Sequence, residues 1–256
     1  MPYHQKKVVV IIPAFNESPS IAQVVSDLRD LSAPEDSRVA LIDEIIVCNN
    51  GSTDDTADKA KLAGAFVCSE FRRGYGYACL RGMKMLQHLG RTKPDHVVFV
   101  DGDHSVNVEE LPRLLSQLIS GNDLVVGSRI AKLQEAGALS PHQQFGNWLA
   151  SWLINKIWRQ PVTDLGPFRA IRYDALLQLD MRDKHFGWTV EMQVKAIQAG
   201  MRYREVAVTT RRRIGVSKIS GTVKGTIGAA FGIFGMVLRL YWRESRFVAS
   251  LKSLPE

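Results

Sequence analysis

Several sequence patterns are missing from this chain of 256 residues, and each absence argues against a class of protein. No G-x-G-x-x-G run follows the first apolar stretch, where the sequence is PAFNES, which argues against a nicotinamide or flavin enzyme. No Gly-Lys-Ser/Thr run occurs, so a Walker-type phosphate loop is not expected. The three cysteines, Cys48, Cys68 and Cys79, have neither paired nor metal-ligand spacing and therefore indicate a reducing compartment.

Long hydrophobic runs are also missing. The longest extends over residues 227–238, twelve residues between basic ones, whereas a membrane-spanning helix needs roughly 20. We expect this run to belong to an amphipathic last helix that lies in a membrane interface, docks on a partner helix or joins the core. The N-terminal run, residues 8–12, leads into Pro13 and predicts a first strand rather than a signal peptide. A domain over residues 1–222 and a tail over 223–256 are expected.

The chain is basic, with a formal net charge of +7 and a pI of about 9.4, and much of the excess lies in the C-terminal half. Such an excess suits a nucleic acid, an anionic membrane face or a phosphorylated substrate, and a solvated basic surface is the alternative. The chain has no helix-turn-helix, RNA-recognition or zinc pattern, so a nucleic-acid partner is not expected.

Apolar runs alternate with amphipathic ones along the chain, which predicts an α/β fold with a mainly parallel sheet and helices on both faces. Strands are expected over residues 8–12, 44–48, 65–68, 97–100, 124–126, 168–172 and 203–208. Helices are expected over residues 20–31, 52–62, 77–89, 108–119, 148–158, 188–199 and 223–242. Ser52 is the expected cap of the second helix. Residues 130–145 and 209–222 are expected to be loops.

Asp101 and Asp103 follow the predicted strand 97–100, in the run VFVDGDHS. Carboxylates at the carboxyl end of a parallel strand reach the crevice where open α/β sheets bind their ligands. Mg²⁺ is commonly held by one or two carboxylates together with substrate phosphates. The pair therefore predicts a metal that contacts a nucleotide diphosphate, and the alternative is a polar turn after a strand.

Several segments together resemble the family 2 glycosyltransferases of GT-A fold, which is Rossmann-like. They are VVVIIPAFNES, CNNGSTDDT, RRGYGYACLRG, VFVDGDHS and VVGSR, in the family's order over residues 7–129. The later segments TDLGPFRAI, FGWTVEMQ and EVAVTTRRRIGVSKISG look like the branch that contains dolichol- and polyprenol-phosphate sugar synthases. The resemblance implies a single GT-A domain with a C-terminal amphipathic helix, and a hexosyltransferase that acts on a nucleotide sugar.

The resemblance implies a donor site at the ends of the first strands and in the glycine loop. Its residues would be Pro13, Phe15, Glu17, Asn49, Asn50, Ser52, Arg73, Gly74, Gly76, Asp101 and Gly102. The family usually has two aspartates where this chain has Asn49 and Asn50, which leaves the choice between a GDP-hexose and a UDP-hexose open. The two glycines would let the backbone approach the diphosphate. The alternative for Asn49–Gly51 and for the glycine loop is a turn.

The metal would be Mg²⁺ or Mn²⁺, bound by Asp101 and Asp103. His104 lies where related synthases often carry a glutamine ligand, so it is a candidate third ligand, and a purely structural histidine is the alternative. The reaction would invert the anomeric carbon while the metal neutralises charge on the leaving diphosphate.

A phosphate acceptor is already ionised near neutral pH and needs cations, whereas a hydroxyl acceptor needs a general base. The resemblance implies that Arg129, Arg213, Ser217 and Lys218 bind a polyprenyl (dolichyl-type) phosphate. A solvated basic loop is the alternative for residues 211–218. For a hydroxyl acceptor, in a lipid or a small molecule, Glu191 is the candidate base, and an exposed helix charge is its alternative.

Asp164 lies in TDLGPF, where related synthases carry Asp-x-x-Ser-Gly, so the acceptor end is expected to differ in detail. The resemblance and the short apolar run together imply a cytoplasmic protein held peripherally at the cytoplasmic membrane face. The last helix would contact lipid, a membrane-protein partner or a second copy of the chain.

Overall fold

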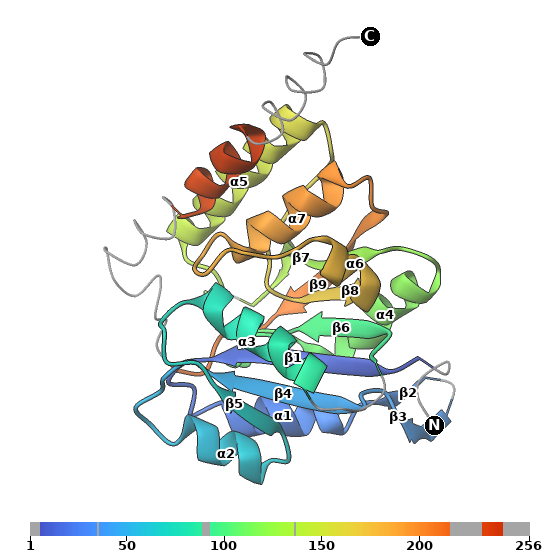
Figure 1. Ribbon diagram of the computed structural model, residues 1–256, viewed down its shortest axis with the longest axis vertical. Coiled ribbons are helices and arrows are strands. Elements are labelled where there is room, and N and C mark those ends of the chain that lie inside the picture. Colours follow the sequence, from blue (N-terminus) through green and yellow to red (C-terminus); the bar gives the residue numbers. More distant parts are fainter. Residues whose placement is uncertain (1–5, 35, 89–92, 136, 216–231, 243–256) are drawn as a thin grey trace.

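A computed structural model describes residues 6–34, 36–88, 93–135, 137–215 and 232–242, and its centre is a seven-stranded sheet (Figure 1). The strand order is β5-β4-β1-β6-β8-β7-β9. The strands are β1 (Val8–Ala14), β4 (Glu44–Asn49), β5 (Phe66–Ser69), β6 (His96–Phe99), β7 (Leu124–Gln134), β8 (Arg169–Arg172) and β9 (Tyr203–Thr210). A separate hairpin joins β2 (Ser32–Ala33) and β3 (Asp36–Ala40).

The sheet is mixed but mainly parallel. β1 runs parallel to both β4 and β6, β4 to β5 and β7 to β9, while β8 is antiparallel to β6 and β7. The chain builds outward from β1 through β4 to β5, and then returns to the other side of β1 as β6. The boundary between β1 and β6 is therefore a topological switch point, where the carboxyl ends of the strands open a crevice.

Helices cover both faces of the sheet. They are α1 (Ile21–Arg29), α2 (Thr56–Leu62), α3 (Tyr75–His88), α4 (Leu111–Ile119), α5 (Pro141–Trp158), α6 (Tyr173–Gln178) and α7 (Trp188–Gln198). Because side chains of a strand alternate between faces, Val8 and Val10 pack with α1 and α4, whereas Val9 and Ile11 pack with α3, α6 and α7. In Figure 1, α3 crosses in front of the sheet.

A third layer lies beyond α7. Helix 232–242, drawn in red, runs beside α5, and their inner faces share one apolar cluster with α7 (Figure 1). Ala150 and Ile154 of α5 meet Met236 and Val237 of helix 232–242 in this cluster. The proposed boundary at residues 222 and 223 lies outside the described residues. No helix in the described ranges is both long enough and apolar enough to cross a membrane.

The expected α/β architecture is confirmed, and the differences are local. Residues 130–145 are not one loop, because β7 pairs with β9 as far as Gln134 and Ser140 caps α5 through a capping box with Gln143. The β2–β3 hairpin and α6 were not predicted. Ser52 does not cap α2, whose first turn follows Asp55; its Oγ instead accepts the backbone N–H of Asn16 at 3.0 Å.

Candidate active site at the end of strand β6

Asp101 and Asp103 lie just past the end of β6, at the switch point beside β1. The Tyr75 hydroxyl donates to Asp101 Oδ1 at 3.1 Å, so α3 contributes directly to the orientation of this carboxylate. Asp103 is 5% exposed, and its Oδ1 accepts the backbone N–H of Ser105 at 3.0 Å. Burial, and then the negative charge of Asp103, raises the pKa of Asp101 to about 7.

Arg213 lies against this carboxylate pair. Its guanidinium is 2.9 Å from Asp103 Oδ2, and the backbone N–H of Ile214 donates to the carbonyl of Asp103 at 2.9 Å. The segment after β9 therefore folds back over the end of β6. The structure thus brings a predicted acceptor residue, Arg213, to a predicted metal ligand; the predicted Ser217 and Lys218 lie outside the described residues.

His104 has a different partner. Its Nε2 lies 2.8 Å from Asp27 Oδ2 on α1, and its backbone φ of +63° lies in the left-handed region. The described residues contain no group of three or more His, Cys, Asp or Glu side chains placed to hold a metal. Asp101 and Asp103 alone fit the pattern of a cation that completes its coordination with phosphate oxygens. The geometry does not favour His104 as a third ligand.

The side-chain amides of Asn49 and Asn50, at the end of β4, differ in the number of hydrogen bonds that they make. Asn50 is buried; its Nδ2 donates to the carbonyls of Glu70 and Arg72, and its Oδ1 accepts the N–H of Gly74 at 2.9 Å. Asn49 uses only its Oδ1, which accepts the N–H of Ser52 at 3.0 Å. Asn50 therefore braces the segment 70–74, whereas the Asn49 amide nitrogen has no hydrogen-bond partner among the described residues.

The remaining predicted donor residues gather at the ends of β1 and β6. Pro13 is buried near the end of β1, and the Phe15 ring lies 3.7 Å below the guanidinium carbon of Arg73. The carbonyl of Glu17 accepts the first N–H of α1, at Ile21, at 2.8 Å. The carbonyl of Gly102 accepts from the Ser20 hydroxyl at 2.7 Å. These residues join the first turn of α1 to the β6 end.

Gly74 and Gly76 have a different role from the one expected. A Cβ on Gly74, whose φ is +150°, would lie 2.2 Å from the carbonyl oxygen of Lys184, and one on Gly76 would lie 2.2 Å from that of Asp183. The Gly76 N–H donates to the His185 carbonyl at 3.2 Å. The glycines therefore admit the backbone of residues 183–185. In this structure that segment, and not an open space for a diphosphate, occupies the side where a Cβ would stand.

A cavity of about 270 Å³ extends from the carboxylates toward the third layer. Its polar and charged lining residues include Tyr75, Asp101, Arg129, Arg211 and Arg213. Its other walls are largely apolar, with contributions from Leu165, Phe168, Phe186, Val208, Ile233 and Phe234. The cavity thus combines arginines with a largely apolar lining next to the candidate metal site.

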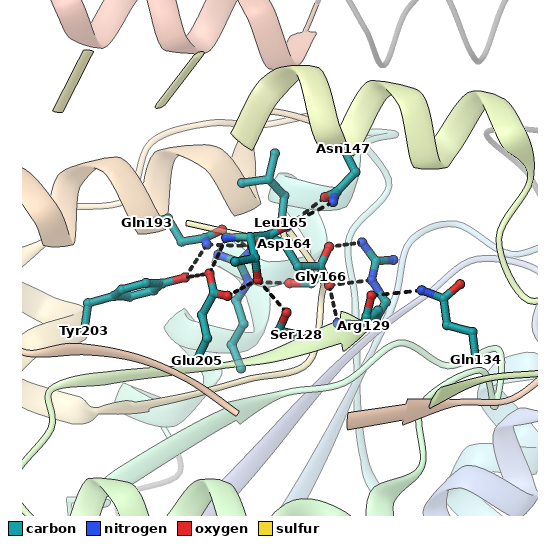
Figure 2. A network of polar contacts seen from close by, with 12 residues as sticks. Ser128, Arg129, Gln134, Asn147, Asp164, Leu165, Gly166, Gln193, Tyr203 and Glu205 are labelled. Atoms are coloured by element: carbon teal, nitrogen blue, oxygen red, sulfur yellow. Dashed lines mark hydrogen bonds and ion pairs between the residues drawn. The ribbon is translucent and has the colours of Figure 1, made fainter. Parts of the chain in front are cut away.

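Asp164 fixes Arg129 at the cavity wall (Figure 2). The Arg129 Nε and a terminal nitrogen both donate to the Asp164 carboxylate at 2.7 Å, and the Arg129 backbone N–H donates at 2.8 Å. Burial acts to lower the pKa of Arg129, but the charge and hydrogen bonds of Asp164, together with the charges of Asp101 and Asp103, outweigh it, so the pKa is raised above its usual value. Arg129 is a permanent cation held in one orientation.

Comparison with known proteins shows the family of the chain. A model of the glycosyl transferase family 2 matches residues 9–179. The chain belongs to this family. An uncharacterized glycosyltransferase of Mycobacterium tuberculosis is 35% identical to this family 2 glycosyltransferase over 232 residues, covering 90% of this chain and 97% of the relative. The undecaprenyl-phosphate mannosyltransferase of Micrococcus luteus is 29% identical over 230 residues, covering 86% and 90%.

Solved structures support the fold of this family 2 glycosyltransferase. The glucosyl-3-phosphoglycerate synthase of Mycobacterium tuberculosis, in complex with Mn²⁺, UDP and phosphoglyceric acid, superposes with a TM-score of 0.72 at 21% identity. The match covers 93% of this chain and 79% of the synthase. At this level of identity the likeness establishes the shared GT-A architecture.

Glu191 of the glycosyltransferase is not exposed, so the alternative of an exposed helix charge is wrong. It is 3% exposed on α7; its carboxylate accepts backbone N–H groups of Arg182 and Asp183, the latter at 2.7 Å, and pairs with Lys195 at 2.7 Å. It is not among the described residues that line the cavity. Glu191 therefore anchors the segment that contacts Gly74 and Gly76, and its position does not favour the role of general base.

A buried polar network under the cavity was not found from the sequence (Figure 2). Arg169 is 1% exposed, and it donates to the carbonyls of Gly166 and Thr189 and to Gln193 Oε1. Burial lowers its pKa to about 10. Gln193 continues the network to the Tyr203 hydroxyl at 2.8 Å. Only the arginine of GPFRAI, between Phe168 and the apolar residues Ala170 and Ile171, could have signalled this network.

Proposed function

We propose that this glycosyltransferase is an inverting, metal-dependent enzyme that moves a hexose from a nucleotide-diphosphate sugar to a polyprenyl phosphate. One observation carries the proposal: three arginines and Asp101 line a cavity whose lining is otherwise largely apolar. A lipid phosphate has the same two parts, an anionic head and an apolar chain. The undecaprenyl-phosphate mannosyltransferase among the relatives supports this acceptor class.

The donor would lie over the ends of β1 and β4. Arg73, fixed against Phe15, would meet the diphosphate, and the unused Asn49 amide nitrogen would donate to a base or ribose oxygen. Asn50 would act through the backbone of residues 70–74 instead of through direct contact. UDP in the synthase structure supports a nucleotide-sugar donor, and we retain both GDP-hexose and UDP-hexose as candidates.

Asp101 and Asp103 would hold Mg²⁺ or Mn²⁺, and Mn²⁺ is present in the synthase structure. A bound divalent cation supplies Lewis-acid neutralisation of the charge that develops on the departing diphosphate. In this structure Arg213 provides the positive charge next to Asp103. Once the carboxylates are neutralised by a cation, the Arg213 guanidinium would be free to bind the acceptor phosphate.

A phosphate acceptor also agrees with the position of Glu191, which does not line the cavity. A phosphate oxygen would form the new bond to the anomeric carbon as the bond to the nucleoside diphosphate breaks, with inversion. The phosphate monoester is already largely ionised at neutral pH, so no protein base is required. The Glu191 carboxylate is engaged by backbone N–H groups and Lys195, which agrees with a reaction that does not use it.

The direct test is transfer by the purified full chain. Labelled GDP- and UDP-hexoses are mixed with polyprenyl phosphate in detergent, with and without Mn²⁺ or Mg²⁺. We expect a lipid-linked product with one donor, loss of product with a chelator, and at least a hundredfold loss in Asp103→Ala. No product with any common nucleotide sugar, or full turnover by Asp103→Ala, would contradict the proposal.

A further inference from the structure

The outward face of the third layer is rich in exposed aromatic rings. On α5, Phe145 is 61% exposed, Trp148 58% and Trp152 50%, at spacings of three and four residues that place them along one side of the helix. The Phe145 and Trp148 ring centroids are 5.9 Å apart. Buried Ala150 and Ile154 occupy the opposite side and pack toward α7. The aromatic side of α5 therefore points away from the body of the enzyme.

Helix 232–242, beside α5 in Figure 1, repeats this arrangement. Leu238 is 51% exposed, Tyr241 44% and Trp242 61%, while Met236 and Val237 are buried in the cluster shared with α5 and α7. We call Phe145, Trp148, Trp152, Leu238, Tyr241 and Trp242 together the aromatic face. An exposed collection of large apolar groups of this kind marks an interaction surface.

The charges on the two helices that carry the aromatic face have one sign. Residues 137–162 and 232–242 contain no aspartate or glutamate. Lys156, Arg159 and Arg239 are exposed on or next to the same two helices. A second copy of the chain would bring these cations against each other without a carboxylate to offset them. An anionic surface is complementary to them.

We infer that the aromatic face docks on an anionic lipid bilayer, with α5 and helix 232–242 lying in the interface plane. Tryptophan and tyrosine rings are stable at the level of the head groups, where the ring is in an apolar setting and its polar atom reaches water. Lysine and arginine beside them add attraction to anionic lipids. This contact needs no membrane-spanning helix, because the two helices would lie on the surface of the bilayer and would not cross it.

The two helices that carry the aromatic face also contribute residues to the lining of the cavity. Gln143, Gly146 and Asn147 of α5 line the cavity, as do Ile233 and Phe234 of helix 232–242. The aromatic face and part of the cavity lining therefore belong to the same two helices. If the acceptor is a lipid phosphate, as proposed above, docking would bring the apolar chamber next to the bilayer from which the acceptor chain comes. This consequence rests on the proposed function, whereas docking itself does not.

The test is flotation of the full chain with vesicles that contain no acceptor and no nucleotide sugar. We expect binding to phosphatidylglycerol–phosphatidylcholine vesicles, little binding to phosphatidylcholine alone, and release at 1 M salt, where the Debye length is about 3 Å. Trp148→Ser/Trp152→Ser should lower the partition coefficient about tenfold or more, because both rings leave the interface. Leu62→Ser on α2 is the matched control, since Leu62 is 87% exposed outside the aromatic face.

Transfer in detergent to a short-chain prenyl phosphate separates the two proposals. The double variant should keep this activity, since neither tryptophan lines the cavity. Unchanged vesicle binding by the double variant, or no binding by the unaltered chain, would overturn docking even if transfer in detergent persists. If the double variant instead loses a dimer and still binds vesicles, the aromatic face joins two copies and the lipid inference fails. Vesicle binding without any prenyl-phosphate product would overturn the proposed function alone.

Discussion

Gly74 and Gly76 are the residues at which the loop before α3 and the first turn of α3 depend most on a distant segment. The backbone of residues 183–185 passes so close that a Cβ at either glycine would lie 2.2 Å from a carbonyl oxygen. Glu191 holds the start of that segment through the N–H groups of Arg182 and Asp183. Tyr75, between the glycines, orients Asp101. A chain of contacts thus runs from α7 to the candidate metal site.

Gly76→Ala should lower the free energy of unfolding by about 1–3 kcal/mol, because the added methyl group meets backbone that cannot rotate away. Gly235→Ala is the matched control: Gly235 also lies in a helix, and a Cβ there has nothing within 4 Å. Alanine should stabilise that exposed helical position by up to about 1 kcal/mol. Urea denaturation of both variants checks the prediction, and equal midpoints would refute it.

Glu191→Gln distinguishes an anchor from a catalytic base. The amide should lower the free energy of unfolding by about 1–3 kcal/mol, since it weakens bonds to two backbone N–H groups and leaves Lys195 without its carboxylate. The kcat at saturating substrates should change by less than tenfold at every pH of its profile. A loss of roughly 10²–10⁴ in kcat, the range for a general base, would instead support a hydroxyl acceptor.

At the scale of elements, the orientation of Arg129 depends on contacts between β7 and the segment before β8. Arg129 lies in β7 opposite Val208 of β9 and is bound by Asp164, while Asn147 of α5 accepts the Leu165 N–H at 2.9 Å. Asn155, further along α5, forms two hydrogen bonds to Val162. Its Nδ2 donates to the Val162 carbonyl, and its Oδ1 accepts the Val162 N–H. One helix therefore fixes the segment that orients a cavity cation.

Asp164→Asn should lower the free energy of unfolding by about 3 kcal/mol, because Arg129 remains partly buried without its carboxylate. It should also raise the acceptor KM more than the donor KM, since the Arg129 guanidinium loses its fixed direction. Asp123→Asn is the control: Asp123 pairs with Arg172 at 2.9 Å and does not line the cavity. This control should lose stability and keep both KM values. Equal effects of the two variants on the acceptor KM would contradict the assignment.

Strongly periodic elements could be predicted from the sequence, and elements fixed by tertiary contacts could not. The apolar run of β1 and the helical spacing of α1 specify their own form. β7 continues past Val126 only because β9 lies beside it, and the antiparallel direction of β8 has no local signal. At the site, the motif located Asp101 and Asp103. The partner of His104 is Asp27 on α1, far away in the chain, whereas Glu191 accepts backbone N–H groups only eight and nine residues before it, through a turn with no sequence signal.

At the scale of the whole molecule, the account requires that metal and nucleotide bind together to the folded chain. Mn²⁺ with the preferred nucleoside diphosphate should raise the melting midpoint by roughly 5–10 °C at a hundredfold excess over Kd. Asp103→Asn should lose the part of this rise that depends on Mn²⁺. His104→Ala should keep it, because the His104 ring is bound to Asp27. A metal-dependent rise in Asp103→Asn as large as in the unaltered chain would exclude this carboxylate as a ligand.

The central claim is that a phosphate accepts the sugar, and a matched pair of acceptors tests it most directly. Polyprenyl phosphate and the polyprenol of the same chain length differ only in the anionic head that the three cavity arginines would bind. The account predicts Mn²⁺- or Mg²⁺-dependent transfer from the labelled nucleotide sugar to the phosphate and none to the alcohol. Transfer to polyprenol at an equal or higher rate would contradict it.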